Sequence, residues 1–186
     1  ATGNKTITEL TGKVEHVSLC GKVPDKADLY LIAPATANSV SKIAHGIDDT
    51  PVTTFATTCI GSNIPIIIVP AMHQSMYEHP IVMDNLKKLQ KKLGITIVGP
   101  KIEESAAKVA ERDEIVDSVI RRLNNGLKGK KITVITGRTE EPIDTMRVLT
   151  NKATGKSGIE IAKRAFRRGA EIELWYGNVK CEIPKW

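Results

Sequence analysis

Aromatic residues are scarce in this chain of 186 residues, and cysteines are few. Phe, Trp and Tyr together make up 4% of the sequence. A surface that binds single-stranded nucleic acid needs repeated aromatic rings for base stacking, so that function is disfavoured. The three cysteines, Cys20, Cys59 and Cys181, are widely spaced and include no Cys-x-x-Cys pair. We therefore expect no zinc site or other metal site and no disulfide framework, and we expect a reducing, cytoplasmic environment.

A long apolar segment is also absent. The longest uncharged stretch lies between Thr50 and Glu78, where Pro, Gly, Asn and several Thr residues interrupt it. A membrane span needs about 20 consecutive apolar residues, so none is expected. The amino terminus shows no signal-peptide pattern. Because the sequence begins with Ala1 rather than Met, we expect a processed chain or a fragment.

The overall composition is that of a globular protein. Hydrophobic residues make up 41% and charged residues 26% of the chain, and about 150 residues per domain predicts one domain plus part of another. The net charge is +6, from 27 Lys and Arg against 21 Asp and Glu. This charge favours anionic ligands such as phosphates. Because the basic residues are scattered along helix-like stretches, solvated helix faces are a better interpretation than a DNA-binding groove.

The first two thirds of the chain alternate buried strands with helices. Residues 29–33 and 64–69 are short, nearly continuous apolar runs, which are typical of strands covered on both faces. A third run, 95–98, follows the helix-breaking Gly94. Helical patterns fill the gaps at 38–44, where Asn or Ser is the expected cap, and at 81–93 and 114–123. We therefore predict an α/β fold with a doubly wound parallel sheet.

The pattern restarts in the last third. Residues 124–130 are polar and rich in Asn and Gly, which predicts a flexible linker. Strand patterns at 132–136 and 172–176 flank a helical pattern at 158–166, which together form one βαβ-like unit. We predict a domain boundary between residues 126 and 127, with a flavoprotein-type domain at 1–126 and the start of a second, Rossmann-like domain at 127–186.

Two segments follow directly after predicted strands. In open α/β sheets, ligands bind beyond the carboxyl ends of the strands. Residues 33–38 combine Pro with small residues at such a point, although an ordinary strand-to-helix turn explains them equally well. Residues 70–77 contain Met72, His73, Met76 and Tyr77 in what we expect to be a ligand-binding loop, because no helix or strand period fits them. The alternative is that the methionines fill a hydrophobic gap.

The remaining candidates are weaker when taken alone. His16 lies beside apolar residues, where a structural histidine is more common than a catalyst, and His45 and His79 are also interpreted as structural. Segments 136–144 and 151–158 combine Gly, Lys and hydroxyl groups before a helix, which suits phosphate. The second segment is not a Walker A loop, because Gly is missing at position 150.

Taken together, these segments resemble known enzymes. Residues 31–39 (LIAPATANS), 42–47 (KIAHGI) and 69–77 (VPAMHQSMY) resemble the flavin-dependent cysteine decarboxylases. Residues 139–144 (TEEPID) and 150–158 (TNKATGKSG) resemble the first part of phosphopantothenate–cysteine ligase. Their order resembles the bifunctional decarboxylase/ligase family of coenzyme A biosynthesis, in its archaeal form.

The resemblance implies an activity and a set of site residues. It implies FMN-dependent decarboxylation of 4′-phospho-N-pantothenoylcysteine to 4′-phosphopantetheine, and ligation of cysteine to 4′-phosphopantothenate with CTP and Mg²⁺. It also implies a cytoplasmic homo-oligomer, a trimer or trimer-based, with FMN between subunits. His16 matches the family's catalytic histidine. His73, where many members have Asn, Met76 and Asn151 match substrate-binding positions. The residues that would line FMN are Pro34, Ala35, Thr36, Ala37 and Ala71.

The chain departs from the family pattern in three ways. The family's amino-terminal strand and its FMN-phosphate loop have no counterpart, so we expect decarboxylase activity to be impaired. Residues 103–110 contain no Cys where many members carry a proton donor. The ligase part ends before the family's later CTP-binding lysines, so we expect no ligase activity. Arg138 also stands where a Gly is usual.

Two other interpretations stay open. The first is a different flavin-dependent peptidyl-cysteine decarboxylase, against which the ligase-like segment argues. The second is a non-catalytic module that forms the oligomer without holding flavin. A nucleic-acid binder rests on net charge alone and is the weakest alternative.

Overall fold

The structure is a computed structural model that describes residues 3–4, 6–103, 106–184 and 186. It divides into two compact units, residues 1–115 and 116–186, and the division falls within helix α6 (Arg112–Leu123). The two units are described separately. The domain boundary expected at residues 126 and 127 remains a prediction. Among the described residues, no helix has the length and apolar character needed to cross a bilayer.

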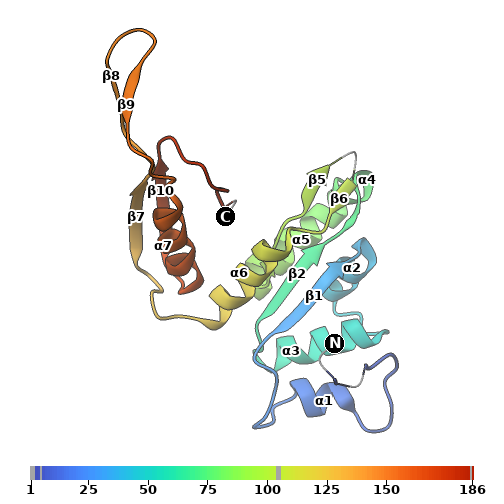
Figure 1. Cartoon of the computed structure of the whole chain (residues 1–186). Coiled ribbons are helices and arrows are strands. Elements are labelled where there is room, and N and C mark those ends of the chain that lie inside the picture. Colours follow the sequence, from blue (N-terminus) through green and yellow to red (C-terminus); the bar gives the residue numbers. More distant parts are fainter. Residues whose placement is uncertain (1–2, 5, 104–105, 185) are drawn as a thin grey trace. The chain divides into compact units, whose positions relative to one another are not determined.

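The first unit contains a three-stranded parallel sheet (Figure 1). Its order is β1 (Tyr30–Ala35), β2 (Ile66–Pro70) and β4 (Thr96–Ile97). All five residues of β2 are buried, as the continuous apolar run predicts. The predicted α/β fold with a parallel sheet is confirmed.

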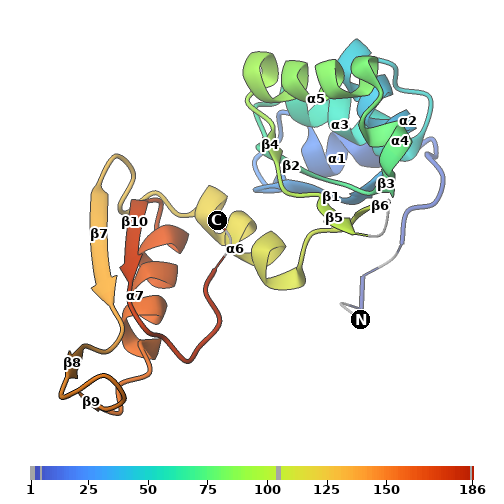
Figure 2. The same ribbon diagram turned by 90° about the horizontal axis from the view of Figure 1, so that it is seen from above.

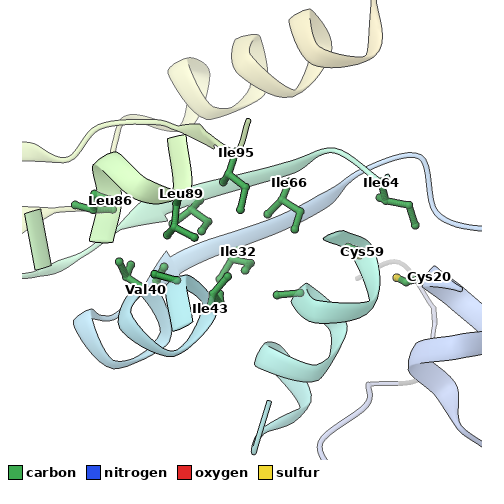
Figure 3. Close-up of a cluster of buried hydrophobic side chains, with 14 residues drawn as sticks. Cys20, Ile32, Val40, Ile43, Cys59, Ile64, Ile66, Leu86, Leu89 and Ile95 are labelled. Carbon is green, nitrogen blue, oxygen red and sulfur yellow. The ribbon is translucent and has the colours of Figure 1, made fainter. Parts of the chain in front are cut away.

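Helices α2 (Ala37–His45), α3 (Pro51–Gly61) and α5 (Pro80–Leu93) lie along one side of these strands (Figure 2). Two begin with proline, whose fixed φ suits the first helical position. Helix α5 ends at Gly94, whose φ of 63° belongs to the left-handed region. Their apolar side chains meet those of the sheet in one cluster, most of which is labelled in Figure 3: Ile32, Val40, Ile43, Ile64, Ile66, Leu86, Leu89 and Ile95.

Several short elements of this unit were not predicted. Helix α1 (Glu15–Cys20) precedes the sheet, and a second, antiparallel sheet has the order β3 (Met72–His73), β6 (Ala106–Lys108) and β5 (Lys101–Glu103). Strand β3 leads into α4 (Gln74–Tyr77), so the prediction of a simple loop at 70–77 was wrong. Elements this short contain too few residues to display a period, and long-range pairing specifies them.

The cap of α2 also differs from the prediction. The helix begins at Ala37, and its cap is Thr36 rather than Asn38 or Ser39. The Thr36 hydroxyl accepts a hydrogen bond from the Ser39 amide at 3.3 Å. This is the usual geometry of a threonine cap, which satisfies an amide that has no partner within the helix.

The second unit is built on two parallel strands, β7 (Lys131–Thr136) and β10 (Glu171–Tyr176), paired along their whole length. Helix α7 (Lys156–Arg167) packs on this ribbon through Ile159, Ala162 and Ala165. These elements confirm the predicted strand, helix and strand. A hairpin of β8 (Glu140–Pro142) and β9 (Val148–Thr150), which was not predicted, projects from the loop after β7 (Figure 1).

Within the second unit, polar contacts join the carboxyl-terminal part of α6 to α7. Arg167 donates to the Asp117 carboxylate at 2.6 Å, and the Asp117 side chain is only 6% exposed. Arg121 donates to the carbonyls of Phe166 and Ala170 at 2.7 and 2.6 Å, and its guanidinium lies 4.3 Å from the centre of the Phe166 ring. A cation at the carboxyl end of α7 interacts favourably with the carbonyl groups there.

The polar segment 124–130 is folded against this helix pair rather than extended as a flexible linker. The Leu127 amide donates to the Arg168 carbonyl at 2.7 Å, and the Lys130 amide donates to the Leu127 carbonyl at 3.0 Å. These bonds make a turn that leads directly into β7. The linker prediction was therefore wrong, because Asn and Gly are as typical of tight turns as of flexible segments.

Candidate functional site

The ends of β1 and β2 bring together the five residues that are predicted to line the cofactor. Ala35 pairs with Pro70 in the parallel register, and the Ala71 amide donates to the Ala35 carbonyl at 2.9 Å. Residues 34–37 and Ala71 therefore lie side by side on two neighbouring segments of backbone at the carboxyl edge of the sheet. We call these five residues the alanine edge. The sequence predicted these residues for one site, and the sheet register brings them side by side.

The alanine edge has the properties that a flat cofactor ring requires. Its side chains are small, and that of Ala35 is fully buried. Pro34 and Thr36 are exposed, so a ring can approach the backbone without displacing a large side chain. The amino terminus of α2 lies at the same edge and favours negative charge. The residues present therefore fit a flavin.

The next segment carries His73 and Met76 away from the same edge. His73 caps α4, because its Nδ1 accepts from the Ser75 amide at 3.3 Å and lies 2.8 Å from the Ser75 hydroxyl. The Met76 side chain is 49% exposed. His73 also pairs with Ala106 in the antiparallel sheet. Both predicted substrate-binding residues are thus exposed within a few residues of Ala71.

Ion pairs stabilise the hairpin of β5 and β6, which neighbours β3. The Lys101 ammonium lies 2.5 Å from Glu103 and 2.7 Å from Glu111. The hydrogen bond from Lys101 is the largest cause that lowers the pKa of Glu103, and the same carboxylates raise the pKa of Lys101. This hairpin lies within residues 103–110, the segment where the resemblance implies a proton-donor Cys in many members. Residues 104 and 105 of that segment lie outside the described residues.

His16 lies in a different part of the first unit. It is in α1, and its ring packs edge-on against Phe55 of α3, with centroids 6.4 Å apart and planes at 79°. Its Nδ1 is buried and has no hydrogen-bond partner among the residues that the structure describes. Nδ1 is thus enclosed by protein, which leaves Nε2 as the nitrogen that can meet a ligand.

Within one chain, His16 is remote from the alanine edge. Phe55 also contacts Tyr30, with ring centroids 6.2 Å apart, and Tyr30 is the first residue of β1. Ala35 is the last residue of the same strand, and five residue steps of about 3.3 Å separate the two by roughly 16 Å. Figure 1 shows α1 near the start of β1 and α4 near its end. The structure does not bring this predicted catalytic residue to the predicted cofactor residues.

The second unit gathers a separate group of residues at the ends of β7 and β10. Gly158, in the first turn of α7, lies so close to β7 that an added Cβ would overlap the Thr136 side chain. The Thr136 hydroxyl donates to the Gly155 carbonyl at 3.0 Å. Gly155 itself has a φ of 78°, which a residue with a side chain rarely adopts. These contacts place the amino terminus of α7 at the carboxyl edge of two parallel strands.

Asn151 lies in the loop before this helix. It is exposed, and its side-chain oxygen accepts from the Ala153 amide at 2.9 Å. Arg138, at the end of β7, donates to Glu140 at 3.0 Å and does not point freely outward. At the same edge, an open hollow of about 500 Å³ is lined by Ile135, Leu174, Trp175, Tyr176 and Gly177. Sequence patterns did not indicate this hollow, because exposed aromatic residues on a strand carry no spacing signal of their own.

Both units match known protein families. Residues 1–124 match the Flavoprotein family, and residues 127–186 match the family described as DNA/pantothenate metabolism flavoprotein C-terminal domain. The first match covers more than half of the chain, and the parallel sheet with its alanine edge is consistent with it. The chain therefore belongs to the Flavoprotein family.

Curated relatives extend the match. The coenzyme A biosynthesis bifunctional protein CoaBC of Thermococcus kodakarensis is 54% identical over 187 residues, which cover 100% of this chain and 45% of the relative. CoaBC of Methanocaldococcus jannaschii is 40% identical over 92% of this chain and 41% of the relative. The chain thus spans less than half the length of these relatives.

The chain is also similar to solved structures of cysteine decarboxylases. The FMN-dependent cysteine decarboxylase SpaF matches with a TM-score of 0.52 and 31% identity, over 65% of this chain and 67% of that chain. A PPC decarboxylase mutant in complex with pantothenoylaminoethenethiol matches with a TM-score of 0.50 and 29% identity, over 57% of this chain and 58% of that chain.

Proposed function

We propose that this chain is the flavoprotein part of an enzyme that uses FMN to decarboxylate 4′-phospho-N-pantothenoylcysteine to 4′-phosphopantetheine. The observation that carries the proposal is the alanine edge in a chain of the Flavoprotein family. The CoaBC relatives and the PPC decarboxylase structure support the choice of substrate. The full-length protein would then serve coenzyme A biosynthesis.

Each predicted residue has a role in this proposal. When bound, FMN would supply the redox chemistry that activates the cysteinyl end of the substrate. Residues 34–37 and Ala71 would hold the ring, because their small side chains let it lie against the backbone. His73 and Met76 would contact the substrate, with a His73 ring nitrogen donating a hydrogen bond to its carboxylate.

His16 can act only if a second copy of the chain contributes to the site. Its ring is separated from the alanine edge of its own chain by the length of β1, so another copy's edge must come to it. A cyclic homo-oligomer, for which we propose a trimer or a trimer-based assembly, would supply that arrangement. Nε2 of His16 would then face the substrate as a proton acceptor, while Nδ1 stays enclosed against α3.

The second unit would belong to a ligase that joins cysteine to 4′-phosphopantothenate with CTP and Mg²⁺ in the full-length protein. The amino terminus of α7 and the close contact of Gly158 with Thr136 suit a phosphate group at this edge. Asn151 would contact the activated substrate from the preceding loop. Three free cysteines suit a reducing compartment, and we place the protein in the cytoplasm.

A second candidate is a cysteine decarboxylase that acts on another substrate. A cysteine/cysteine sulfinic acid decarboxylase is 38% identical over 82% of this chain, and SpaF is a structural relative. Comparing turnover of phosphopantothenoylcysteine with turnover of a peptide that ends in cysteine would separate the two. Decarboxylation of the peptide alone would replace the first proposal with the second.

The visible absorption spectrum of the purified, extensively dialysed chain tests the cofactor assignment. We expect a flavin band, retained or restored by added FMN. Ala71→Leu should abolish the band, because a larger side chain occupies the place of the ring. Thr57→Leu introduces the same side chain on the exposed side of α3 and should keep the band. A folded chain that binds no FMN would leave only the non-catalytic oligomerising module.

A further inference from the structure

Two cysteine thiols meet in the core of the first unit. Cys20 is the last residue of α1 and Cys59 lies near the end of α3, and their side chains are 3% and 0% exposed. Both are free, and they lie at the same end of the hydrophobic cluster (Figure 3). Burial is the largest cause that raises the pKa of Cys59 to about 12, and a hydrogen bond with Cys20 is the next. The two side chains therefore lie near each other in the buried cluster, where the end of α1 packs on α3.

The cysteine pair lies where α1 packs on α3. His16 precedes Cys20 by four residues, and Phe55 precedes Cys59 by four residues, so each pair lies on one face of its helix. His16 packs on Phe55, and Cys20 and Cys59 lie one helical turn further along their helices, in the same buried cluster. A change at the cysteine pair is therefore transmitted directly to the helix that carries His16.

Helix α1 is the weaker partner of this contact. It has six residues, and its cap, Val14, has φ and ψ of 53° and 49° with no side-chain hydrogen bond. A β-branched residue in the left-handed region is strained, and a helix this short is not stable alone. Local opening of α1 would expose both thiols together.

We propose that Cys20 and Cys59 form a redox-sensitive pair, in which a two-electron thiol oxidant produces an intramolecular disulfide that clamps α1 to α3. In this step both S–H bonds break and one Sγ–Sγ bond forms. Two electrons and two protons pass to the oxidant. Diamide, the probe we choose, accepts them at its N=N bond and becomes the hydrazine. A dithiol reverses the reaction by thiol–disulfide exchange.

Treatment of the full chain with diamide tests this proposal. Thiol titration in denaturant should fall from three groups per chain to one, and peptide mapping should find Cys20 linked to Cys59. The link closes a loop of about 40 residues, so the melting temperature of the first unit should rise by on the order of 10 °C. Amide exchange in α1 should slow as well, and a dithiol should reverse every change.

Cys181 in the second unit provides the matched control. Cys181→Ala should still lose two thiols, whereas Cys59→Ala should lose none, with Cys20→Ala as the second test if the first variant does not fold. Wild-type protein that keeps all three thiols would overturn the proposal. A link through Cys181 or between two chains would do the same, as would a Cys20–Cys59 disulfide that leaves the melting temperature unchanged.

Discussion

At the scale of single residues, the surroundings of His16 decide its role. It lies beside apolar residues such as Val17 in the sequence, which favours a structural histidine. The structure instead shows Nδ1 buried with no partner in the described part of the chain, where a purely structural histidine would normally be hydrogen-bonded. His45 contrasts with it, because its Nδ1 lies 2.8 Å from the Ser41 carbonyl within its own helix. His79 likewise caps α5 by accepting from the Ile81 amide at 3.2 Å.

The first prediction concerns His16. In the full-length protein, His16→Gln should lower kcat for decarboxylation by about 100-fold or more, which is the usual contribution of a general base. The flavin band should be kept, because the residues that would hold the ring, 34–37 and Ala71, are unchanged. His45→Gln is the matched control and should keep full activity. Equal loss of activity in both variants would contradict the role of His16.

At the scale of elements, close contacts at strand ends determine how helices are placed. Gly158 is the clearest case, because Thr136 occupies the space that a Cβ would need. At α1, by contrast, the contact joins the loop before the helix to its first turn. The Thr11 hydroxyl donates to the Glu15 carboxylate, and the Thr11 amide donates to the same group at 3.1 Å.

The second prediction is that Gly158→Ala destabilises the second unit. The added methyl group must move α7 away from β7, and overpacking of this kind costs about 1–3 kcal/mol. Urea denaturation followed by circular dichroism measures the loss. Gly126→Ala is the control, because an added Cβ there meets nothing within 4 Å. A Gly158→Ala variant as stable as the control would show that α7 is not packed against β7 as described.

The third prediction concerns acid. The hydrogen bond from the Thr11 side chain is the largest cause that lowers the pKa of Glu15 from 4.5 to about 2. A carboxylate with a lowered folded pKa stabilises the fold above its unfolded pKa, and this contribution is lost as the pH falls toward the folded value.

The urea midpoint of Glu15→Gln should therefore lie below that of the wild type at pH 5, and the two should converge as the pH approaches 2. The effect should be small, because Glu15 is on the surface. Glu9→Gln supplies the matched control. A difference that grows as the pH falls would have the opposite sign and would contradict the assignment.

At the scale of the whole molecule, several apolar side chains at α1 and in β1 are exposed. Val14, Val17, Leu19 and Leu31 are between 39% and 46% exposed. Large exposed apolar surfaces are a common mark of protein interfaces. The proposed role of His16 also requires a second copy, because His16 is remote from the alanine edge of its own chain.

The fourth prediction is that the full chain forms a homo-oligomer, expected as a trimer, through this surface. Light scattering after size exclusion should show it, and Val17→Asp should shift the chain to a monomer because it buries a charge in the interface. Leu93→Asp changes a residue of similar exposure, 42%, at the end of α5, and should leave the assembly intact. A wild-type monomer at high micromolar concentration would contradict the proposal.

The sequence by itself determined the regular parts of this protein. Strand β2 is a continuous run of Ile and Val, and α5 and α7 repeat apolar residues at helical spacing, so burial on one or both faces required those structures. The small residues of the alanine edge were also recognisable from the sequence. The family match to residues 1–124 agrees with the motifs found there.

Tertiary structure alone decided the rest. The two-residue strand β3 exists because β6 pairs with it, and the turn at 124–130 exists because the end of α7 supplies partners for its backbone. The distance of His16 from Ala35, and the nearness of Cys20 to Cys59, depend on how α1 packs on α3. Each of these features joins residues far apart in the chain, and local spacing carries no information about such pairs.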